Sequence, residues 1–190
     1  MQISLIPQGF DMHIGNSLVI CRSLKCFVTY SDLVREILKS NNADFKGTDH
    51  QIDTYFKVSN GRLKLRKGNI ENQLIFYDRE NKQDPKKSDI ALFKTESNIS
   101  LKEVLIKSLG VLVVVDKQRE IYFIDNVKFH IDTVKDLGTF VEIEAIGENE
   151  KADKDELLRQ CKYYMKLFKI SAEDLISVSY SDLLLQKGDS

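Results

Sequence analysis

The sequence predicts an α+β fold, an eight-stranded antiparallel β-barrel with amphipathic helices packed on its outside. Three observations support this fold class. Most of the chain falls into short runs in which charged and aliphatic residues alternate, which is the period of a β-strand. The runs with a helical period are too few to cross over between parallel strands. These helices also need apolar surface to cover, and the aliphatic faces of the strands supply it.

The composition is that of a globular protein, with 42% hydrophobic and 30% charged residues among 190. A net charge of -1 argues against nucleic-acid and membrane-surface partners, which select a basic face. The three cysteines, Cys21, Cys26 and Cys161, have no metal-site spacing and form no even disulfide set. Because no long apolar run is present, we expect a soluble, cytoplasmic protein.

The length fits a single domain. We expect that domain at residues 17–186, preceded by an N-terminal extension at 1–16 and followed by a loose tail at 187–190.

Strand-like alternation recurs along the whole chain. We expect strands at residues 17–29, 52–58, 62–67, 74–79, 89–95, 111–118, 119–125, 127–134 and across Glu142 and Glu144, and the sequence leaves open where 111–118 ends and 119–125 begins. Turn residues separate these runs. The clearest is Asn60-Gly61, a strong hairpin signal between the second and third strands.

Helical spacing occurs in fewer places. We expect helices over 32–40 with Ser31 as cap, over 101–109 with Ser100 and Glu103 as a capping box, from Asp153 onward, and briefly from Ser171. The apolar residues in 180–185 are expected to dock the end of the chain against the body.

The strands are predicted to carry charge on one face and aliphatic residues on the other. In 61–66, for example, Arg62, Lys64 and Arg66 share one face and the leucines share the other. Because the helices cover the aliphatic faces, the charged faces should point into the barrel lumen. The residues assigned to the lumen in this way are Lys25, Arg62, Lys64, Arg66, Lys117, Arg119, Lys128, Asp132, Glu142 and Glu144, with Arg79 as an addition.

Cations outnumber carboxylates in this set, so the lumen is expected to be net positive and to attract an elongated anion. The carboxylates of Asp132, Glu142 and Glu144 suit a hard divalent cation, which takes oxygen ligands and is commonly shared with phosphates. His130 shares the inward face and is expected to be a packing or hydrogen-bonding residue.

Six segments carry a resemblance to a known family. They are 53–58 (DTYFKV), 61–66 (GRLKLR), 74–79 (LIFYDR), 85–88 (PKKS), 129–132 (FHID) and 137–144 (LGTFVEIE). In this order they resemble the CYTH superfamily, the triphosphate tunnel metalloenzymes, and are most similar to its class IV adenylyl cyclase-like branch.

The resemblance implies an eight-stranded antiparallel barrel whose tunnel binds a small-molecule triphosphate (inorganic triphosphate, ATP or thiamine triphosphate) with Mg²⁺ or Mn²⁺. By motif match, the phosphate would be held by Arg62, Lys64, Arg66, Arg79, Lys117, Arg119 and Lys128, and the metal by Asp132, Glu142 and Glu144.

The first strand departs from the family pattern. The family carries an ExExK signature there, and the matching residues are Cys21, Ser23 and Lys25, so only the lysine is retained. A thiol and a hydroxyl are poor replacements for carboxylates around Mg²⁺. The resemblance still assigns Lys25 a catalytic role, in which its amine orients the nucleophile or stabilises charge.

Three functions are open at this point. An enzyme would stabilise a transferring phosphoryl group while water attacks a terminal phosphorus, or while a ribose hydroxyl attacks the α-phosphorus of ATP and expels pyrophosphate. A binding module would hold a triphosphate, polyphosphate or nucleotide without turnover, which the missing glutamates favour. An interaction protein would pair its opposite charges internally. We expect the enzyme first. The oligomeric state is left open, with a homodimer among the alternatives.

Overall fold

The computed structural model describes residues 20–78, 89–95, 99–147 and 152–188. Its strands are β1 (Ile20–Phe27), β2 (Asp44–Phe56), β3 (Arg62–Lys67), β4 (Gln73–Asp78), β5 (Asp89–Lys94), β6 (Val111–Ile124), β7 (Val127–Val134) and β8 (Gly138–Gly147). Its helices are α1 (Ser31–Ser40), α2 (Ile99–Leu109), α3 (Lys154–Leu167) and α4 (Tyr180–Gly188), with a single 3₁₀ turn, η1 (Ala172–Asp174). The predicted extension at 1–16 lies outside the described residues.

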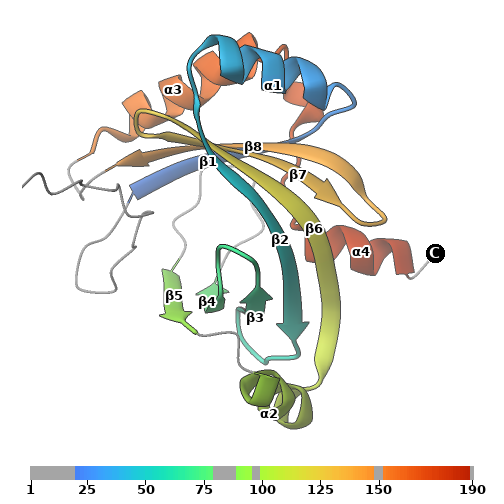
Figure 1. The fold of residues 1–190 in the computed structure, drawn as a ribbon. Coiled ribbons are helices and arrows are strands. Elements are labelled where there is room, and N and C mark those ends of the chain that lie inside the picture. Colours follow the sequence, from blue (N-terminus) through green and yellow to red (C-terminus); the bar gives the residue numbers. More distant parts are fainter. Residues whose placement is uncertain (1–19, 79–88, 96–98, 148–151, 189–190) are drawn as a thin grey trace, which may run out of the picture.

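The eight strands form one antiparallel sheet in the order β1-β8-β7-β6-β2-β3-β4-β5. The long central strands β2 and β6 bend, so that the β1–β8–β7 half lies opposite the β3–β4–β5 half (Figure 1). The predicted α+β class and the eight antiparallel strands are therefore confirmed. Between the described residues of β1 and β5 no strand pairing closes the ring, so the sheet is a strongly curved, open barrel.

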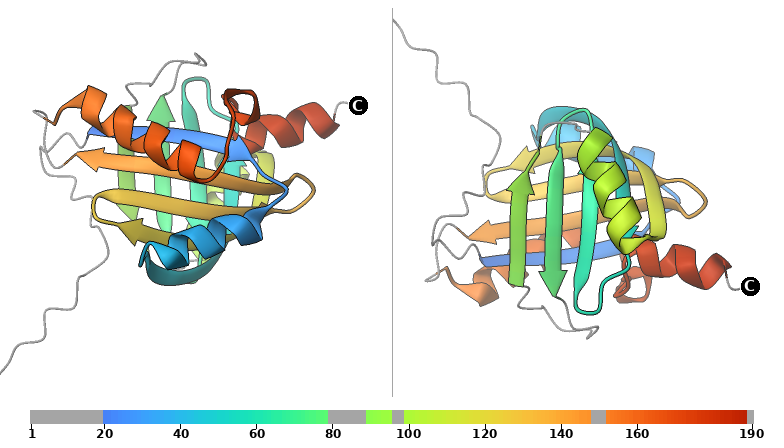
Figure 2. Two further views of the ribbon diagram at one scale, coloured as in Figure 1. Left: turned by 90° about the horizontal axis from the view of Figure 1, so that it is seen from above. Right: turned by 90° about the horizontal axis from the view of Figure 1, so that it is seen from below.

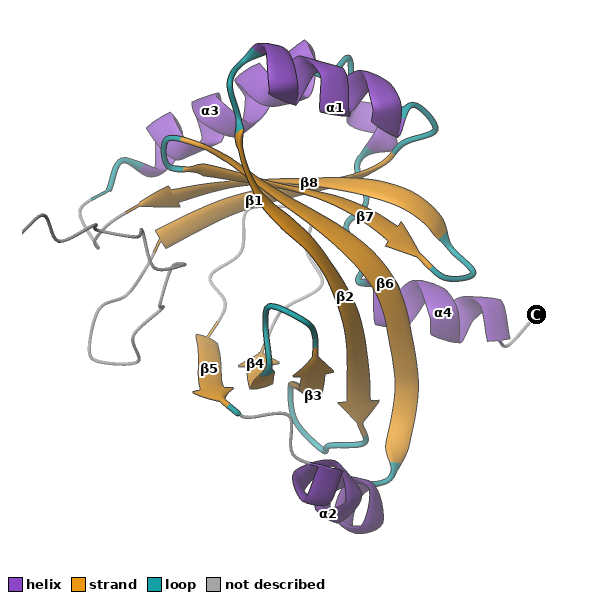
Figure 3. Ribbon diagram, viewed as in Figure 1, coloured by secondary structure: helices purple, strands orange, loops and turns teal. Residues whose placement is uncertain are grey.

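Helices α1 and α3 lie across the outer face of β1, β8 and β7 (Figure 2, left). The core between them is apolar because strand alternation turns one face of each strand outward. Phe129 and Ile143 of the sheet, Leu38 of α1 and Cys161 of α3 are all fully buried there. This packing fixes the direction of the opposite strand faces, which turn away from the helices and into the sheet's concave side (Figure 3).

Two strands are longer than the sequence predicts. β2 begins at Asp44, well before the start near 52 that the sequence predicts. The strand period of this first half is hidden in the sequence because its inward residues are polar and a register shift beside Gly47 interrupts the alternation. β6 is continuous from Val111 to Ile124, so the runs 111–118 and 119–125 form one strand. Through that region β6 pairs with β2 without a register shift, from Ile121 opposite Gly47 to Val113 opposite Tyr55.

Both predicted serine caps are wrong. Tyr30, which has no side-chain capping bond, occupies the N-cap of α1, and Ser31 is the first helical residue. Its hydroxyl instead accepts a hydrogen bond from Arg35 at 3.1 Å. α2 begins at Ile99, so Ser100 lies inside the helix and not before it. The predicted ends are better, since Gly110 follows α2 with a positive φ of 72°, as a helix stop requires.

The apolar residues of 180–185 pack against the sheet, as predicted, since Tyr180, Leu183 and Leu184 join the cluster that contains Tyr55 and Phe140. The residues just before them bind the edge of the sheet. Leu175 forms an isolated bridge with Cys26, and the Ile176 amide donates to the Lys25 carbonyl at 2.8 Å, so this segment covers part of the outer edge of β1. The segment then turns into α4, which runs to Gly188. No helix in the described ranges combines the length and apolarity needed to span a membrane.

We expect Phe129→Ala to lower the free energy of unfolding by about 3–5 kcal/mol, because it removes a large side chain from a filled core. Phe129 is fully buried and packs edge-on against Tyr164 at 4.7 Å and Phe168 at 5.6 Å. Phe93→Ala is the matched control: this ring is 64% exposed, so the change should cost less than about 1 kcal/mol. Urea unfolding measures both, and equal losses would contradict the assignment of the core.

Candidate functional site

Charged side chains from six strands, β1, β2, β3, β6, β7 and β8, face the concave side of the sheet, which we call the charged interior. Its described members include every site residue expected from the sequence except Arg79, which lies outside the described residues. Ion pairs and hydrogen bonds join those members into three clusters and a set of contacts with the end of the chain.

The first cluster is centred on Asp53 of β2, which is fully buried. Its carboxylate accepts from Arg66 at 2.8 and 2.9 Å and from Lys64 at 2.8 Å, and Lys117 lies 3.8 Å away. Burial opposes ionisation, but these three cations outweigh it and hold the pKa of Asp53 well below its ordinary value. One carboxylate thus joins cations from β3 and β6.

The second cluster is centred on Arg119 of β6. Its guanidinium donates to both oxygens of Asp132, at 2.7 and 2.5 Å, and to Glu142 at 2.8 Å. Glu142 also lies 3.3 Å from Nδ1 of His130, as the expected hydrogen-bonding role of that residue requires. Nε2 of His130 is buried and has no hydrogen-bond partner among the described residues. Burial and the nearby Arg119 lower the pKa of His130 to about 4.

The third cluster surrounds Glu71, in the loop between β3 and β4. Its carboxylate accepts from Arg66 at 2.7 Å and from Gln51 at 3.2 Å, and Lys128 lies 3.6 Å away. These cations outweigh the effect of burial and lower the pKa of Glu71.

The fully buried Asp49 holds this loop in place. Its carboxylate accepts from the backbone amides of Asn69, Ile70 and Glu71 at 2.6 to 3.1 Å. A Cβ at Gly68 would lie 2.7 Å from an Asp49 oxygen, so the loop requires glycine there. Asp49 therefore sets the position of Glu71 inside the sheet.

The predicted catalytic residue Lys25 and the predicted phosphate-binding residue Arg62 contact residues 175–182, which we call the C-terminal arm. The Lys25 ammonium donates to the Val178 carbonyl at 2.5 Å. Arg62 donates to Ser179 at 2.5 Å and to Asp182 at 3.0 Å. Tyr180 of the arm donates its hydroxyl to Asp132 at 2.8 Å. The arm thus reaches three predicted site residues, one assigned to catalysis, one to phosphate and one to metal.

The charged interior is not strongly positive, which corrects the expectation from the sequence. Asp49, Asp53, Glu71 and Asp182 add carboxylates that the strand pattern did not bring forward, and together with the three predicted acids they equal the seven predicted cations among the described residues. The pKa of Lys117 shows the effect of burial among these charges. Burial, followed by repulsion from Arg119, lowers its pKa to about 7.

The predicted metal ligands have suitable chemistry, but their oxygens are engaged within the fold. Asp132 and Glu142 share Arg119, and Glu144 lies opposite Lys128 in the β7–β8 register. In the described part of the chain no three His, Cys, Asp or Glu side chains gather as a metal site. Ser23 stands opposite Glu144 on β1, where the family signature has a glutamate. A divalent cation would therefore need Arg119 to turn away from its carboxylates.

Sequence reasoning missed several residues for different reasons. Asp49, Gln51 and Asp53 lie two residues apart along β2, and this spacing indicates that they share one face of a strand. Glu71 lies in a loop and Tyr180 lies beyond the last predicted element, so neither belongs to a periodic pattern that points inward. Only the fold brings them to the site.

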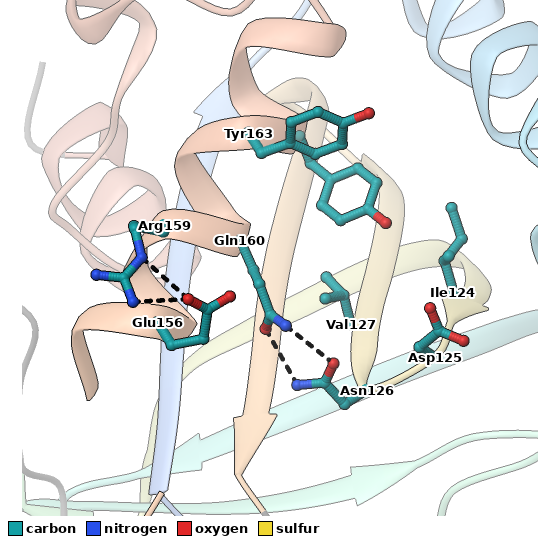
Figure 4. A pocket seen from close by; sticks show the side chains of 9 residues that line it. Ile124, Asp125, Asn126, Val127, Glu156, Arg159, Gln160 and Tyr163 are labelled. Atoms are coloured by element: carbon teal, nitrogen blue, oxygen red, sulfur yellow. Dashed lines mark hydrogen bonds and ion pairs between the residues drawn. The ribbon is translucent and has the colours of Figure 1, made fainter. Parts of the chain in front are cut away.

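A separate cavity of about 280 Å³ lies outside the charged interior, between α3 and the β6–β7 turn. Figure 4 shows Asn126 and Gln160 facing each other there, with Tyr163 above them. The two amides pair at 3.1 and 3.3 Å. None of the predicted site residues lines this cavity.

A comparison with family models matches residues 22–180 to the CYTH domain. No curated protein matches the chain in sequence.

Solved structures with the same fold include PH1012 of Pyrococcus horikoshii, at 24% identity and a TM-score of 0.72, covering 86% of this chain and 99% of that one. A conserved Pyrococcus furiosus protein has 21% identity and the same TM-score and coverage. A candidate adenylate cyclase of Vibrio parahaemolyticus has 17% identity and a TM-score of 0.65, covering 86% and 97%. At these identities the likeness shows the fold.

We expect Asp53→Asn to destabilise the protein by about 3–5 kcal/mol, because it leaves buried cations without their shared carboxylate. Added tripolyphosphate should recover part of this loss by supplying new oxygens. Asp155→Asn, at an exposed position on α3, is the matched control and should cost less than about 1 kcal/mol. Thermal and urea unfolding with and without tripolyphosphate test this, and an Asp53→Asn protein as stable as the wild type would refute it.

Proposed function

The chain belongs to the CYTH domain family, whose match extends over residues 22–180, and on this premise we propose that its charged interior binds a triphosphate with a divalent cation and cleaves a phosphoanhydride bond. Proteins of this family bind triphosphates in general. The observation that carries the proposal is the convergence of Lys64, Arg66 and Lys117 on the buried carboxylate of Asp53. Cations gathered at one buried point form a preorganised anion site.

Binding would occur as an exchange of anions. Arg66 and Lys117 would turn from Asp53 to phosphate oxygens, which carry more charge and accept bidentate bonds from guanidinium groups. Lys64, 2.8 Å from Asp53, would keep that carboxylate paired. Lys128, whose partner Glu71 is 3.6 Å away, would contribute from β7. Inorganic triphosphate, ATP and thiamine triphosphate all offer the required phosphates.

Asp132, Glu142 and Glu144 are the proposed oxygen ligands for Mg²⁺ or Mn²⁺, since family members depend on a divalent metal in general. When bound, such a cation would neutralise phosphate charge and polarise the phosphoanhydride. Arg119, which contacts two of these carboxylates, would release them by turning toward the phosphate. Arg119 would thus link phosphate binding to the release of two metal ligands.

Hydrolysis is the reaction we propose first. A water oxygen forms a bond to the terminal phosphorus, the phosphoanhydride bond breaks, and orthophosphate leaves the shortened chain after losing a proton to solvent. Lys25, which stands opposite Glu142 in the β1–β8 register, would stabilise charge beside the reacting group. Cyclisation of ATP, in which a ribose hydroxyl attacks the α-phosphorus and expels pyrophosphate, is the alternative outcome at the same site. The products distinguish the two.

Binding without turnover is a second candidate. Cys21 and Ser23 pair with Ile146 and Glu144 of β8, and neither supplies the carboxylate that the family signature has on this strand. Together with the engagement of Asp132 by Arg119 and Tyr180, this favours a protein that holds a triphosphate but positions the cation weakly.

We expect metal-dependent release of phosphate or pyrophosphate from inorganic triphosphate, ATP or thiamine triphosphate. Replacing both Glu142 and Glu144 by Gln should lower the rate by about a hundredfold or more. The double change removes two proposed ligands of the divalent cation, and with that cation the stabilisation of charge at the reacting phosphoryl group. Glu156→Gln, on an exposed turn of α3, is the matched control and should keep the wild-type rate. If none of these substrates is cleaved while tripolyphosphate still raises the melting temperature, the binding module replaces the enzyme.

We expect the affinity for tripolyphosphate to fall as the pH rises above about 7. Phosphate favours the charged form of Lys117, whose pKa is lowered to about 7 by burial and by Arg119, so binding above that pH must take up a proton. The loss approaches about tenfold per pH unit. Lys117→Arg stays charged and should remove this component, while titration of the phosphate itself affects both proteins equally. Parallel pH profiles from calorimetry would contradict the assignment.

A further inference from the structure

We propose that the C-terminal arm is a fixed end wall of the charged interior, and that it restricts the site to triphosphates with an unesterified terminal phosphate. This inference rests on the proposed binding of triphosphates. It assigns the choice among them to Tyr180, a residue outside every predicted strand and site motif.

Strand register shows that the arm lies at one end of the interior. Tyr180 packs with Tyr55 near the end of β2, Val134 at the end of β7 and Phe140 near the start of β8. In an antiparallel sheet these positions meet at the same end. Figure 1 shows α4 beside the β7–β8 turn, and Lys187 of α4 donates to the Asp136 carbonyl in that turn. Glu71 and Lys128 lie toward the opposite end.

The arm is held at this end by backbone and charged contacts together. Its first residues bond to the edge of β1 through Leu175 and Ile176. The Asp182 carboxylate accepts a hydrogen bond from Arg62 at 3.0 Å and another from the Ser179 amide at 3.1 Å. The second bond caps the start of α4. The Arg62–Asp182 pair is about three-quarters buried. Such contacts indicate a fixed wall and not a loose strap.

Tyr180 forms the inner surface of the wall. Its side chain is among the buried residues, and its ring lies 4.9 Å from that of Phe140. The ammonium groups of Lys25 and Lys117 lie 4.3 and 5.4 Å from the ring centroid. A terminal phosphate held by Lys117 would therefore contact the tyrosine ring. The other two phosphates of the triphosphate would then extend toward Arg119 and Lys128.

The chemistry of the selection follows from this geometry. A terminal phosphate without an ester carries only oxygens, which two ammonium groups and a tyrosine can accommodate. A terminal phosphate with a nucleoside attached would need the volume that Tyr180 fills. Inorganic triphosphate and ATP each have an unesterified end, whereas diadenosine triphosphate has an adenosine on both terminal phosphates.

Calorimetric titration in the presence of Mn²⁺ tests the wall with these three compounds. We expect the wild type to bind tripolyphosphate and ATP, and to bind diadenosine triphosphate at least about tenfold more weakly than ATP. In Tyr180→Ala that difference should shrink to about threefold or less, with tripolyphosphate still bound. Tyr163→Ala removes a tyrosine that is 60% exposed on α3 and should behave as the wild type. If Tyr180→Ala does not unfold cooperatively, Tyr180→Leu keeps apolar contact with Phe140 and provides the same comparison.

Two results would overturn the end-wall inference and leave the proposed function intact. One is wild-type binding of diadenosine triphosphate as tight as that of ATP, which would mean that the arm moves aside or lies away from the phosphates. The other is a folded Tyr180 variant that binds tripolyphosphate and still rejects diadenosine triphosphate. Failure of the wild type to bind tripolyphosphate would instead refute the proposed function, and the end wall with it.

Discussion

The arrangement depends on the pairing of buried cations with buried carboxylates inside a curved sheet. Lys64, Arg66 and Lys117 would repel one another if they converged without a counter-charge, and Asp53 supplies that charge from the neighbouring strand β2. Arg119 and Asp132 repeat the same solution on β6 and β7. The folded chain is therefore self-neutralised, and a ligand can enter only by replacing one set of oxygens with another.

The helices explain why so much charge lies inside. α1 and α3 cover the aliphatic faces of β1, β8 and β7, and strand alternation then leaves the polar faces no direction but inward. An open barrel admits this because its two halves face each other across the charged groups. The C-terminal arm binds the edge of β1 and brings Tyr180 to Asp132 in the charged interior.

The sequence predicts the positions of the cations because those positions follow a local rule. Arg62, Lys64 and Arg66 had to share a face whatever the tertiary structure. Their partners could not be predicted in the same way, since the pairing of Arg66 with both Asp53 and Glu71 depends on strand register and on a loop held by Asp49. The expected net-positive lumen failed for this reason. The early start of β2 was missed because polar inward residues and a register shift at Gly47 conceal its strand period.

Carbon-13 NMR of the aspartate carboxylates tests directly whether phosphate replaces Asp53 as the partner of the buried cations. Asp53 can be assigned by comparison with Asp53→Asn, and Asp155 on the surface of α3 serves as an internal reference. We expect tripolyphosphate to shift the Asp53 carboxyl signal in a saturable, one-to-one manner and to leave the Asp155 signal unchanged. Saturable binding of tripolyphosphate with an unmoved Asp53 signal would contradict this expectation, because the ligand would then occupy a different part of the protein.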